Sequence, residues 1–486
     1  MQTSHTTIAS APAVTRMHWS TRGLLILAFA GVAGVVALHA GLLPRGGWGA
    51  DEYQTFGMFR QNGWSYLWFR FWSWSPRPFS EALIALYALL VRATDRPHLA
   101  LVLGVFWAAA LVALLPALSG ARGVARLYRL LGALSLLCVV ILGRDVGSVF
   151  YWPFGAVAYA PVVVIGMALL FHSAATPAPR RSARTVIGAS LIAVAWASEV
   201  GAMLVIVYTS VSVLWLVWRR ERIGLAIWLP LFAAGTLIAG LVLGTRGGMP
   251  MLPDGNAARY HHPMASVLAA AQRLLPELLS FDGRHFDGRA LLVGTLVKLA
   301  FFIGIQGCWM STDPALRDAR ARLPVLALSL PLTCFAILTA SYYEFGTDCC
   351  DRHAFIRQAF WFMTIAALAI WTAPAAAPDR GWRSVVTPVA LLFAVGLMLA
   401  PRVPDLWRDY AAYREPMIAR ALTWQSGRSP GPTMTLFQPP SDRLYVNQIP
   451  DHPDGCAEGW WVDSIRRFFP GKTCIRVVSG ADLPKP

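Results

Sequence analysis

The sequence contains few charged residues. Only 14% of its 486 residues are Asp, Glu, Lys or Arg, whereas 56% are hydrophobic and the mean hydropathy is +0.50. One soluble core could not bury so much apolar surface, and the apolar residues occur in long blocks. The composition therefore excludes an ordinary soluble protein and predicts a polytopic membrane protein.

Internal repeats are also lacking, and the one biased stretch, Ala and Pro at residues 373–378, is typical of a loop. Basic residues outnumber acidic ones by 42 to 26, but they lie in short segments between the apolar blocks. That distribution indicates membrane orientation rather than nucleic-acid binding. We therefore expect no nucleic-acid partner.

Eleven apolar blocks are candidate membrane spans. They cover residues 23–43, 99–118, 130–142, 152–171, 186–199, 202–218, 224–244, 291–308, 324–340, 355–371 and 385–400. The first block follows Arg16 and Arg22 and could be a cleaved signal sequence, but it is long enough to span. We retain it as the first membrane helix.

Arginines mark alternate connections between these blocks, at residues 122–129, 180–184, 219–222, 317–322 and 380–383. The positive-inside rule places these connections and the N-terminus in the cytoplasm. The outer face then carries residues 44–77, 143–151, 199–201, 245–289, 341–353 and everything after Arg402.

The apolar residues 79–91 do not fit this alternation, because a span there would put the Arg122 connection outside. Residues 76–91 form a short segment that includes Glu81. We expect this segment to lie in or dip into the outer interface. Residues 1–401 then form an all-α membrane domain. Residues 402–486 form a small α/β cap, with predicted strands at 444–447 and 474–478 around a helix at 460–469.

Two adjacent carboxylates, Asp51 and Glu52, come soon after the first span. Near a membrane but in reach of water, such a carboxylate can serve as a general base, although a solvated acidic pair ending a helix has the same spacing. The aromatic residues 53–74 that follow, with Arg60 and Arg70 among them, are typical of an interface belt or of a helix lining a sugar-binding cleft.

Other acidic groups lie on the same predicted face. Arg144 and Asp145 could form a local ion pair in the second outer loop. Glu199 interrupts an apolar stretch and indicates either a functional site or a hydrogen bond between helices.

Cations gather on the outer face as well. The large loop carries Arg246, Arg259, His261, His262, Arg273, Arg284 and His285, and the next loop ends in Arg352 and His353. His353 and Arg357, four residues apart, would share one helix face. Such a cluster favours binding of a phosphate or diphosphate, or of anionic lipid headgroups.

Metal ligation has little support in the sequence, because no His/Cys spacing matches a zinc site. A hard cation such as Mg²⁺ or Mn²⁺ on Asp51 and Asp145 would be reasonable chemistry. Of the seven cysteines, Cys349, Cys350, Cys456 and Cys474 lie in outer segments, where disulfides form. We expect a Cys456–Cys474 disulfide. Adjacent cysteines rarely pair, so Cys349 or Cys350 could instead reach the cap.

As a layout, the chain resembles the GT-C superfamily of membrane glycosyltransferases, which use lipid-phosphate-linked sugars. The resemblance rests on Asp51 and Glu52 after the first helix, the aromatic stretch, Asp145, the late loop with Arg352, and the outer cap. More faintly, Trp460 and Trp461 resemble the cap helix of bacterial proteins that add glucose to O antigen.

The resemblance implies a function and roles for these residues. Asp51 would be the general base of an inverting transfer from a polyprenyl-phosphate sugar to a glycan or lipid acceptor, with Glu52 as neighbour and substitute. Asp145 would hold the acceptor or a cation, and we place Glu199, His261 and His262 with it. Arg352 would bind the donor phosphate, assisted by Arg357 and His353. The enzyme would lie in a bacterial inner membrane with its site and C-terminus in the periplasm.

Two other functions remain open. An O-antigen-type polymerase or ligase acting on diphosphate-linked glycans would use the Arg and His residues of the large loop and would need no carboxylate base. A transporter of lipid-linked glycans would need no catalysis, but it should carry ionisable residues at several depths rather than at one face.

Overall fold

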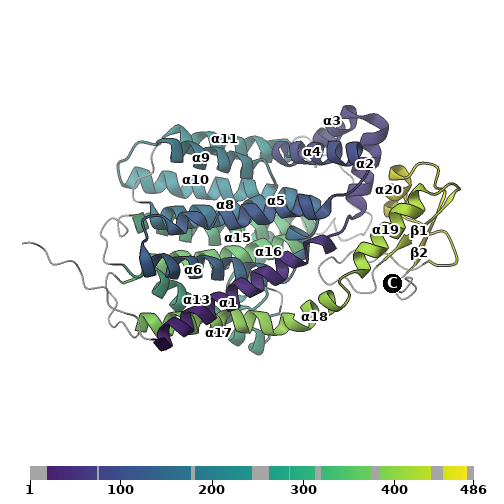
Figure 1. The fold of residues 1–486 in the computed structure, drawn as a ribbon. Coiled ribbons are helices and arrows are strands. Elements are labelled where there is room, and N and C mark those ends of the chain that lie inside the picture. The colour runs from purple at the N-terminus through teal and green to yellow at the C-terminus, as the bar shows by residue number, and fades with distance from the viewer. Residues whose placement is uncertain are drawn as a thin grey trace, which may run out of the picture.

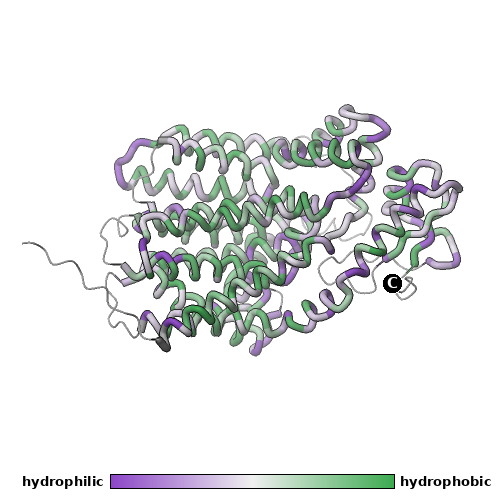
Figure 2. Tube along the Cα trace, viewed as in Figure 1, coloured by the Kyte–Doolittle hydropathy of each residue, from purple (hydrophilic) through white to green (hydrophobic). Residues whose placement is uncertain are grey.

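The chain folds into a bundle of roughly parallel and antiparallel helices with a small domain at one end, as the computed structural model in Figure 1 shows. The structure describes residues 19–73, 76–176, 181–242, 262–283, 285–311, 319–374, 382–438 and 452–478. Hydrophobic residues dominate the middle of the bundle and hydrophilic ones gather toward its ends (Figure 2). We call the end that carries the small domain the cap end.

Nine helical stretches within the described residues are long and apolar enough to cross a membrane. Their main helices are α1 (Trp19–Gly41), α5 (Leu99–Val112), α6 (Gly123–Ile141), α8 (Pro153–Ala175), α10 (Glu199–Trp218), α13 (Gly288–Trp309), α15 (Leu323–Phe345), α16 (Asp351–Trp371) and α17 (Thr387–Leu399). Two expected spans are shorter helices, α9 (Arg181–Ala195) and α11 (Leu225–Gly240). An all-α polytopic membrane protein is therefore confirmed at this level.

The expected boundary after residue 401 falls inside a helical stretch. Helix α17 continues through the short η6 (Ala400–Arg402) into α18 (Val403–Ala411). Proline is tolerated in the first turn of a helix, so Pro401 and Pro404 do not end the helical path. Tyr410 of α18 donates a hydrogen bond to the carbonyl of Leu38, which fixes α18 against the end of α1.

Expected loops at the cap end contain further helices. Residues 44–77 include α2 (Ala50–Asn62) and α3 (Trp64–Ser73), preceded by the short η1 (Leu43–Arg45), and residues 143–151 include α7 (Gly147–Phe150). In the expected loop 245–289, residues 243–261 lie outside the described part, and α12 (Pro263–Leu279) follows them. The short helix η2 (Leu115–Leu118) follows α5, and η5 (Trp382–Val386) precedes α17.

The segment expected in the interface is helix α4 (Pro78–Thr94), which does not belong to the nine stretches. At its start, Phe79 and Ser80 donate hydrogen bonds to the carbonyls of Trp196 and Ala197 in the turn before α10. At its other end, Asp95 accepts a hydrogen bond from Arg60 of α2 at 2.5 Å. Both ends of α4 therefore meet elements of the cap end.

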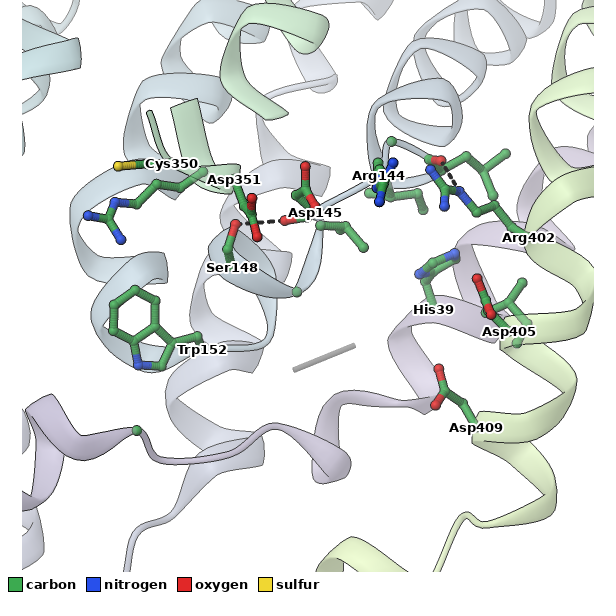
Figure 3. Close-up of a pocket in the computed structure, with 18 of the residues that line it drawn as sticks. His39, Arg144, Asp145, Ser148, Trp152, Cys350, Asp351, Arg402, Asp405 and Asp409 are labelled. Carbon is green, nitrogen blue, oxygen red and sulfur yellow. Dashed lines mark hydrogen bonds between the residues drawn. The ribbon is translucent and has the colours of Figure 1, made fainter. Parts of the chain in front are cut away.

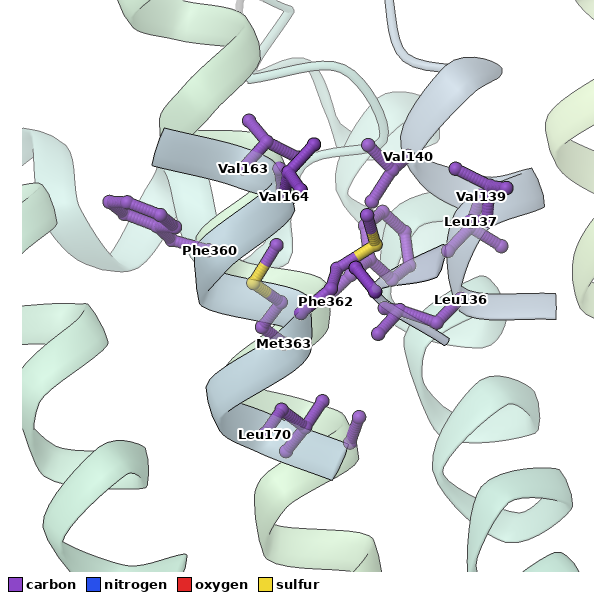
Figure 4. Packing of buried hydrophobic residues seen from close by; sticks show 14 of the residues in the cluster. Leu136, Leu137, Val139, Val140, Val163, Val164, Leu170, Phe360, Phe362 and Met363 are labelled. Atoms are coloured by element: carbon purple, nitrogen blue, oxygen red, sulfur yellow. The ribbon is translucent and has the colours of Figure 1, made fainter. Parts of the chain in front are cut away.

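The centre of the bundle is packed by α6, α8 and α16, as Figure 4 shows. Leu136, Val163 and Met363 are fully buried there. Burying such side chains is worth about 1.5–3 kcal/mol each in water, whereas in lipid close packing supplies most of the stabilisation.

The cap contains α19 (Glu415–Arg428), β1 (Thr433–Phe437), α20 (Trp460–Phe468) and β2 (Cys474–Val478). Strands β1 and β2 are parallel, with Thr433 opposite Cys474. The expected helix and second strand are present. The expected strand 444–447 lies outside the described residues, and β1 was not predicted.

Disulfides join Cys456 to Cys474, the pairing favoured from the sequence, and Cys349 to Cys350. The second pairing differs from our expectation that adjacent cysteines would not bond each other. Each cysteine of the adjacent pair lies in the short turn between α15 and α16, remote from the cysteines of the cap in the sequence.

The cap docks on α2 through α20. A Cβ atom on Gly57 would lie 2.7 Å from the backbone of Arg467 and Phe468, so this close approach requires glycine. Trp48, Tyr53 and Trp424 surround the ring of Phe468 in an aromatic cluster. This second hydrophobic core holds the cap over the end of the bundle.

Candidate active site at the cap end

A cavity of about 820 Å³ lies where the bundle meets the cap. Its walls come from segments far apart in the sequence: the start of α2, the turn after α6, the start of α16, helix α18 and the cap helix α20. Three residues singled out from the sequence, Asp51, Asp145 and Arg352, line this one cavity.

Asp51 lies in the first turn of α2, where Gly49 begins the helix in an extended conformation. Burial raises the pKa of its carboxyl above the ordinary value of 3.8, and the positive charges of Arg70 and Arg352 oppose that rise. A carboxylate at a helix N-terminus is also favoured by the helix dipole. Asp51 is therefore a carboxylate that faces a cavity and has a perturbed pKa, as a general base requires.

Glu52 does not line the cavity, so the structure does not support its expected role as a substitute base. Its carboxylate is fully buried and accepts hydrogen bonds from the backbone N–H groups of Gly49 at 2.8 Å and Phe154 at 3.1 Å. Burial raises its pKa to about 8, against the effect of these two hydrogen bonds. Glu52 thus joins the first turns of α2 and α8 and has a structural role.

Asp145 lies in the turn between α6 and α7 with a φ of 39°, in the left-handed region that Asp and Asn tolerate better than most residues. Its carbonyl accepts hydrogen bonds from the hydroxyl and the N–H of Ser148. In Figure 3 Asp145 lies near Asp351 and Ser148 at the cavity wall. Its neighbour Arg144 forms an ion pair with Asp282 at 3.6 Å.

Arg352 lies in the first turn of α16, and its Nε donates a hydrogen bond to the Tyr159 hydroxyl at 3.1 Å. Within the described ranges no salt bridge joins Arg352 to a carboxylate. The rest of its guanidinium fork therefore has donors for an incoming anion, and arginine matches a phosphate with planar, paired hydrogen bonds.

Arg357, expected to assist Arg352, does not line the cavity. Its guanidinium is fully buried and donates hydrogen bonds to Glu277 at 2.8 Å and to Asp348 at 2.7 Å. Five residues along an α-helix turn the chain through about 500°, so Arg352 and Arg357 point about 140° apart. The helix geometry therefore separates the two arginines that the sequence had placed in one site.

His353 and Glu199 lie behind the cavity wall rather than on it. The ring of His353 is buried, packs edge-on against Tyr159 at 5.8 Å and approaches Glu199 to 4.0 Å. Glu199 accepts a hydrogen bond from Arg77 at 2.5 Å. Tyr159 thus contacts His353 and bonds Arg352, so this group can position Arg352 but cannot itself meet a ligand in the cavity.

The expected histidine contribution is not found in this cavity. His261 lies outside the described residues, and His262 is exposed at the start of α12. As for a metal ion, the described part of the chain contains no group of three His, Cys, Asp or Glu residues that could hold one. Asp51 and Asp145 share the cavity but fall short of such a set, and we derive no step through a cation.

Other lining residues were missed from the sequence. The wall also includes Arg402, the last residue of η6, and Asp405 and Asp409 of α18. Trp460 of α20, named from the sequence without a role in the site, lines it as well. Figure 3 shows Arg402, Asp405 and Asp409 on the side of the cavity near His39. Their spacing of three and four residues places the three side chains on one face of the continuous helical stretch, a signal that the sequence carried.

Comparisons with known proteins return no relative: no protein family, no curated protein and no solved structure matches this chain.

Proposed function

We propose that this protein is a membrane glycosyltransferase that moves a sugar from a polyprenyl-phosphate donor to a hydroxyl group of a cell-envelope glycan or lipid. The observation that supports this most is that Asp51 and Arg352 line the same cavity at the end of an apolar helix bundle. One group suits proton removal and the other suits a phosphate. The bundle would keep the lipid tail in the bilayer while the sugar reaches the cavity.

The proposed reaction is a single displacement with inversion. Asp51 accepts the proton of the acceptor hydroxyl as its oxygen forms a bond to the anomeric carbon. The bond between that carbon and the phosphate oxygen breaks, and its electron pair leaves with the polyprenyl phosphate. Arg352 stabilises the charge on the departing phosphate. Because the donor is already activated, no further co-reactant is needed.

The surroundings of Asp51 support its proposed role as the general base. Burial raises the pKa of Asp51 and so strengthens it as a proton acceptor, while the positive charges of Arg70 and Arg352 limit that rise. Its neighbour Arg70 is held by both oxygens of Glu81 at 3.1 Å. We further propose a bacterial inner-membrane location, with the cavity and cap on the periplasmic side.

The test uses the purified full chain in liposomes with a polyprenyl-phosphate hexose and extracts of envelope glycan as acceptor. We expect a glycosylated product by mass spectrometry, and loss of the same glycan from a strain without the gene. Product formed only from diphosphate-linked glycans would favour the polymerase. Movement of the lipid-linked sugar across the bilayer without product would favour transport.

A further inference from the structure

A second hollow, distinct from the candidate active site, lies between the start of α5 and cap helix α19. This groove has a volume of about 960 Å³, and none of its lining residues lines the cavity that contains Asp51. Its polar side is made by Arg96, His98, Arg420 and Arg428, and no Asp or Glu lines it in the described ranges. The proposed transfer reaction uses none of these residues.

The cations of the groove differ in how far they are already paired. Arg428 forms an ion pair with Asp95, and the same carboxylate also pairs with Arg60. Arg420 donates hydrogen bonds to the carbonyls of Gly46 at 2.7 Å and Pro44 at 2.9 Å, and no carboxylate pairs with it among the described residues. Arg96 is exposed with no ion pair in that part of the chain, and Nε2 of His98 is buried without a partner. The groove therefore has a surplus of positive charge.

The apolar side of the groove continues onto the surface of a candidate span. Leu99 and Leu101, which line the groove, are the first residues of the span Leu99–Leu118. Leu101 and three residues further along the span, Val105, Val112 and Leu115, are exposed by 56–61%. Spacings of four, seven and three residues place them on one helix face. This face is a stripe that an acyl chain could follow from the groove along the span.

The first turn of α5 adds to the positive potential at the same place. His98 is the residue before the helix, and it lines the groove together with Arg96 and the first helical residues, Leu99 and Ala100. The positive end of the helix dipole therefore lies at the groove. An anion held there would neutralise Arg96 and Arg420 while its tail remained on the apolar stripe. Charge and apolar surface thus point to one kind of ligand.

We propose that this groove binds the phosphate headgroup of an anionic phospholipid of the surrounding leaflet, with an acyl chain along the stripe of α5. Arg420 also holds η1 through Pro44 and Gly46, and residues on either side of η1, His39 and Gly49, line the candidate active site. A bound phospholipid would therefore fix the cap and the segment leading to Asp51 in the membrane plane.

Native mass spectrometry of the full chain in detergent tests this, with phosphatidylglycerol, phosphatidylcholine and polyprenyl phosphate added separately. We expect phosphatidylglycerol to bind at least about tenfold tighter than phosphatidylcholine, as one charge-assisted contact supplies. Arg96→Gln with His98→Gln should remove that preference. Arg92→Gln, an exposed arginine of α4 outside the groove, should leave it unchanged.

Arg420→Gln is a second variant and should also weaken the preference for phosphatidylglycerol. Arg420 holds backbone carbonyls as well, so this variant could fail to fold. In that case the double variant at Arg96 and His98 tests the proposal. Equal binding of phosphatidylglycerol and phosphatidylcholine, or an unchanged preference in the Arg96 and His98 variant, overturns the proposal. Preferential binding of polyprenyl phosphate over phosphatidylglycerol also overturns it and would assign the groove to the isoprenoid lipid instead. None of these results depends on whether Asp51 is catalytic.

Discussion

Two arginines near the start of α16, Arg352 and Arg357, lie in opposite surroundings. Arg352 faces a cavity, bonds a tyrosine hydroxyl and pairs with no carboxylate within the described residues, whereas Arg357 is fully buried between Glu277 and Asp348. The same residue type thus has two roles five positions apart. An arginine with its charge already balanced stabilises the fold, and one with donors left over can receive a ligand.

Asp51 and Glu52 repeat this contrast with carboxylates. Asp51 lines the cavity, and Glu52 uses both oxygens to accept backbone hydrogen bonds at the starts of α2 and α8. Adjacent positions on a helix point about 100° apart, so one carboxylate can face the ligand while its neighbour packs inward. Composition alone does not distinguish such a pair.

The largest expected effect is a loss of stability on substitution of the buried arginine, Arg357. Arg357→Ala leaves the buried Glu277 without its ion-pair partner, and breaking a buried pair in this way costs about 3–5 kcal/mol. Asp348 would keep its ion pair with Arg273 at 3.7 Å. We expect a marked fall in the melting temperature of the detergent-solubilised protein. A melting temperature equal to that of the wild type would mean that Arg357 does not have a structural role.

A smaller effect, on donor binding rather than stability, is expected at the cavity. Arg352→Ala removes a phosphate-binding fork and should raise the KM for the polyprenyl-phosphate sugar about tenfold. Arg352→Lys should restore only part of the affinity, because lysine lacks the planar fork. The melting temperature should change little. An unchanged donor KM in Arg352→Ala would remove this arginine from the site.

The smallest effect is a shift of the pH profile. A base acts in its ionised form, and burial raises the pKa of Asp51 above 3.8, so the rate should rise with pH through an acid limb that lies above pH 3.8. Arg70 lowers that pKa, so Arg70→Gln should move the limb to higher pH. Arg92→Gln is the matched control, because it removes one positive charge at a residue that does not line the cavity, and it should leave the limb in place. A limb that stays in place, or moves to lower pH, contradicts this electrostatic account.

Much of the membrane architecture could be predicted from the sequence, because hydrophobic blocks of span length are a strong signal. The eleven expected blocks correspond to the nine candidate spans and to α9 and α11. The continuation of the last span through η6 into α18 was not expected, because the apolar block ends at residue 400 and the charged and polar residues that follow were assigned to the cap. Strand β1 was missed because Thr433–Phe437 is short and pairs with a strand about 40 residues away.

The candidate site was predictable only in part, because the sequence gives residue types and not the direction of side chains. Asp51, Asp145 and Arg352 do lie together, as the outer-loop pattern suggested. His353, Glu199 and Arg357 carry similar chemistry but belong to buried contacts, which depend on how α10, α12 and α16 pack. The helical face that Arg402 of η6 shares with Asp405 and Asp409 of α18 could have been recognised from its spacing.

The central claim is that Asp51, and not its neighbour Glu52, is the base of a sugar transfer. The most direct test compares single-turnover transfer by Asp51→Asn and Glu52→Gln in the same liposomes. We expect Asp51→Asn to fold normally and to lose at least about a hundredfold in rate, the usual scale for a general base. In Glu52→Gln an amide nitrogen replaces one acceptor oxygen, which should lower the melting temperature while the folded fraction keeps most of its rate. Wild-type transfer by Asp51→Asn, or a hundredfold loss in folded Glu52→Gln alone, would contradict the assignment.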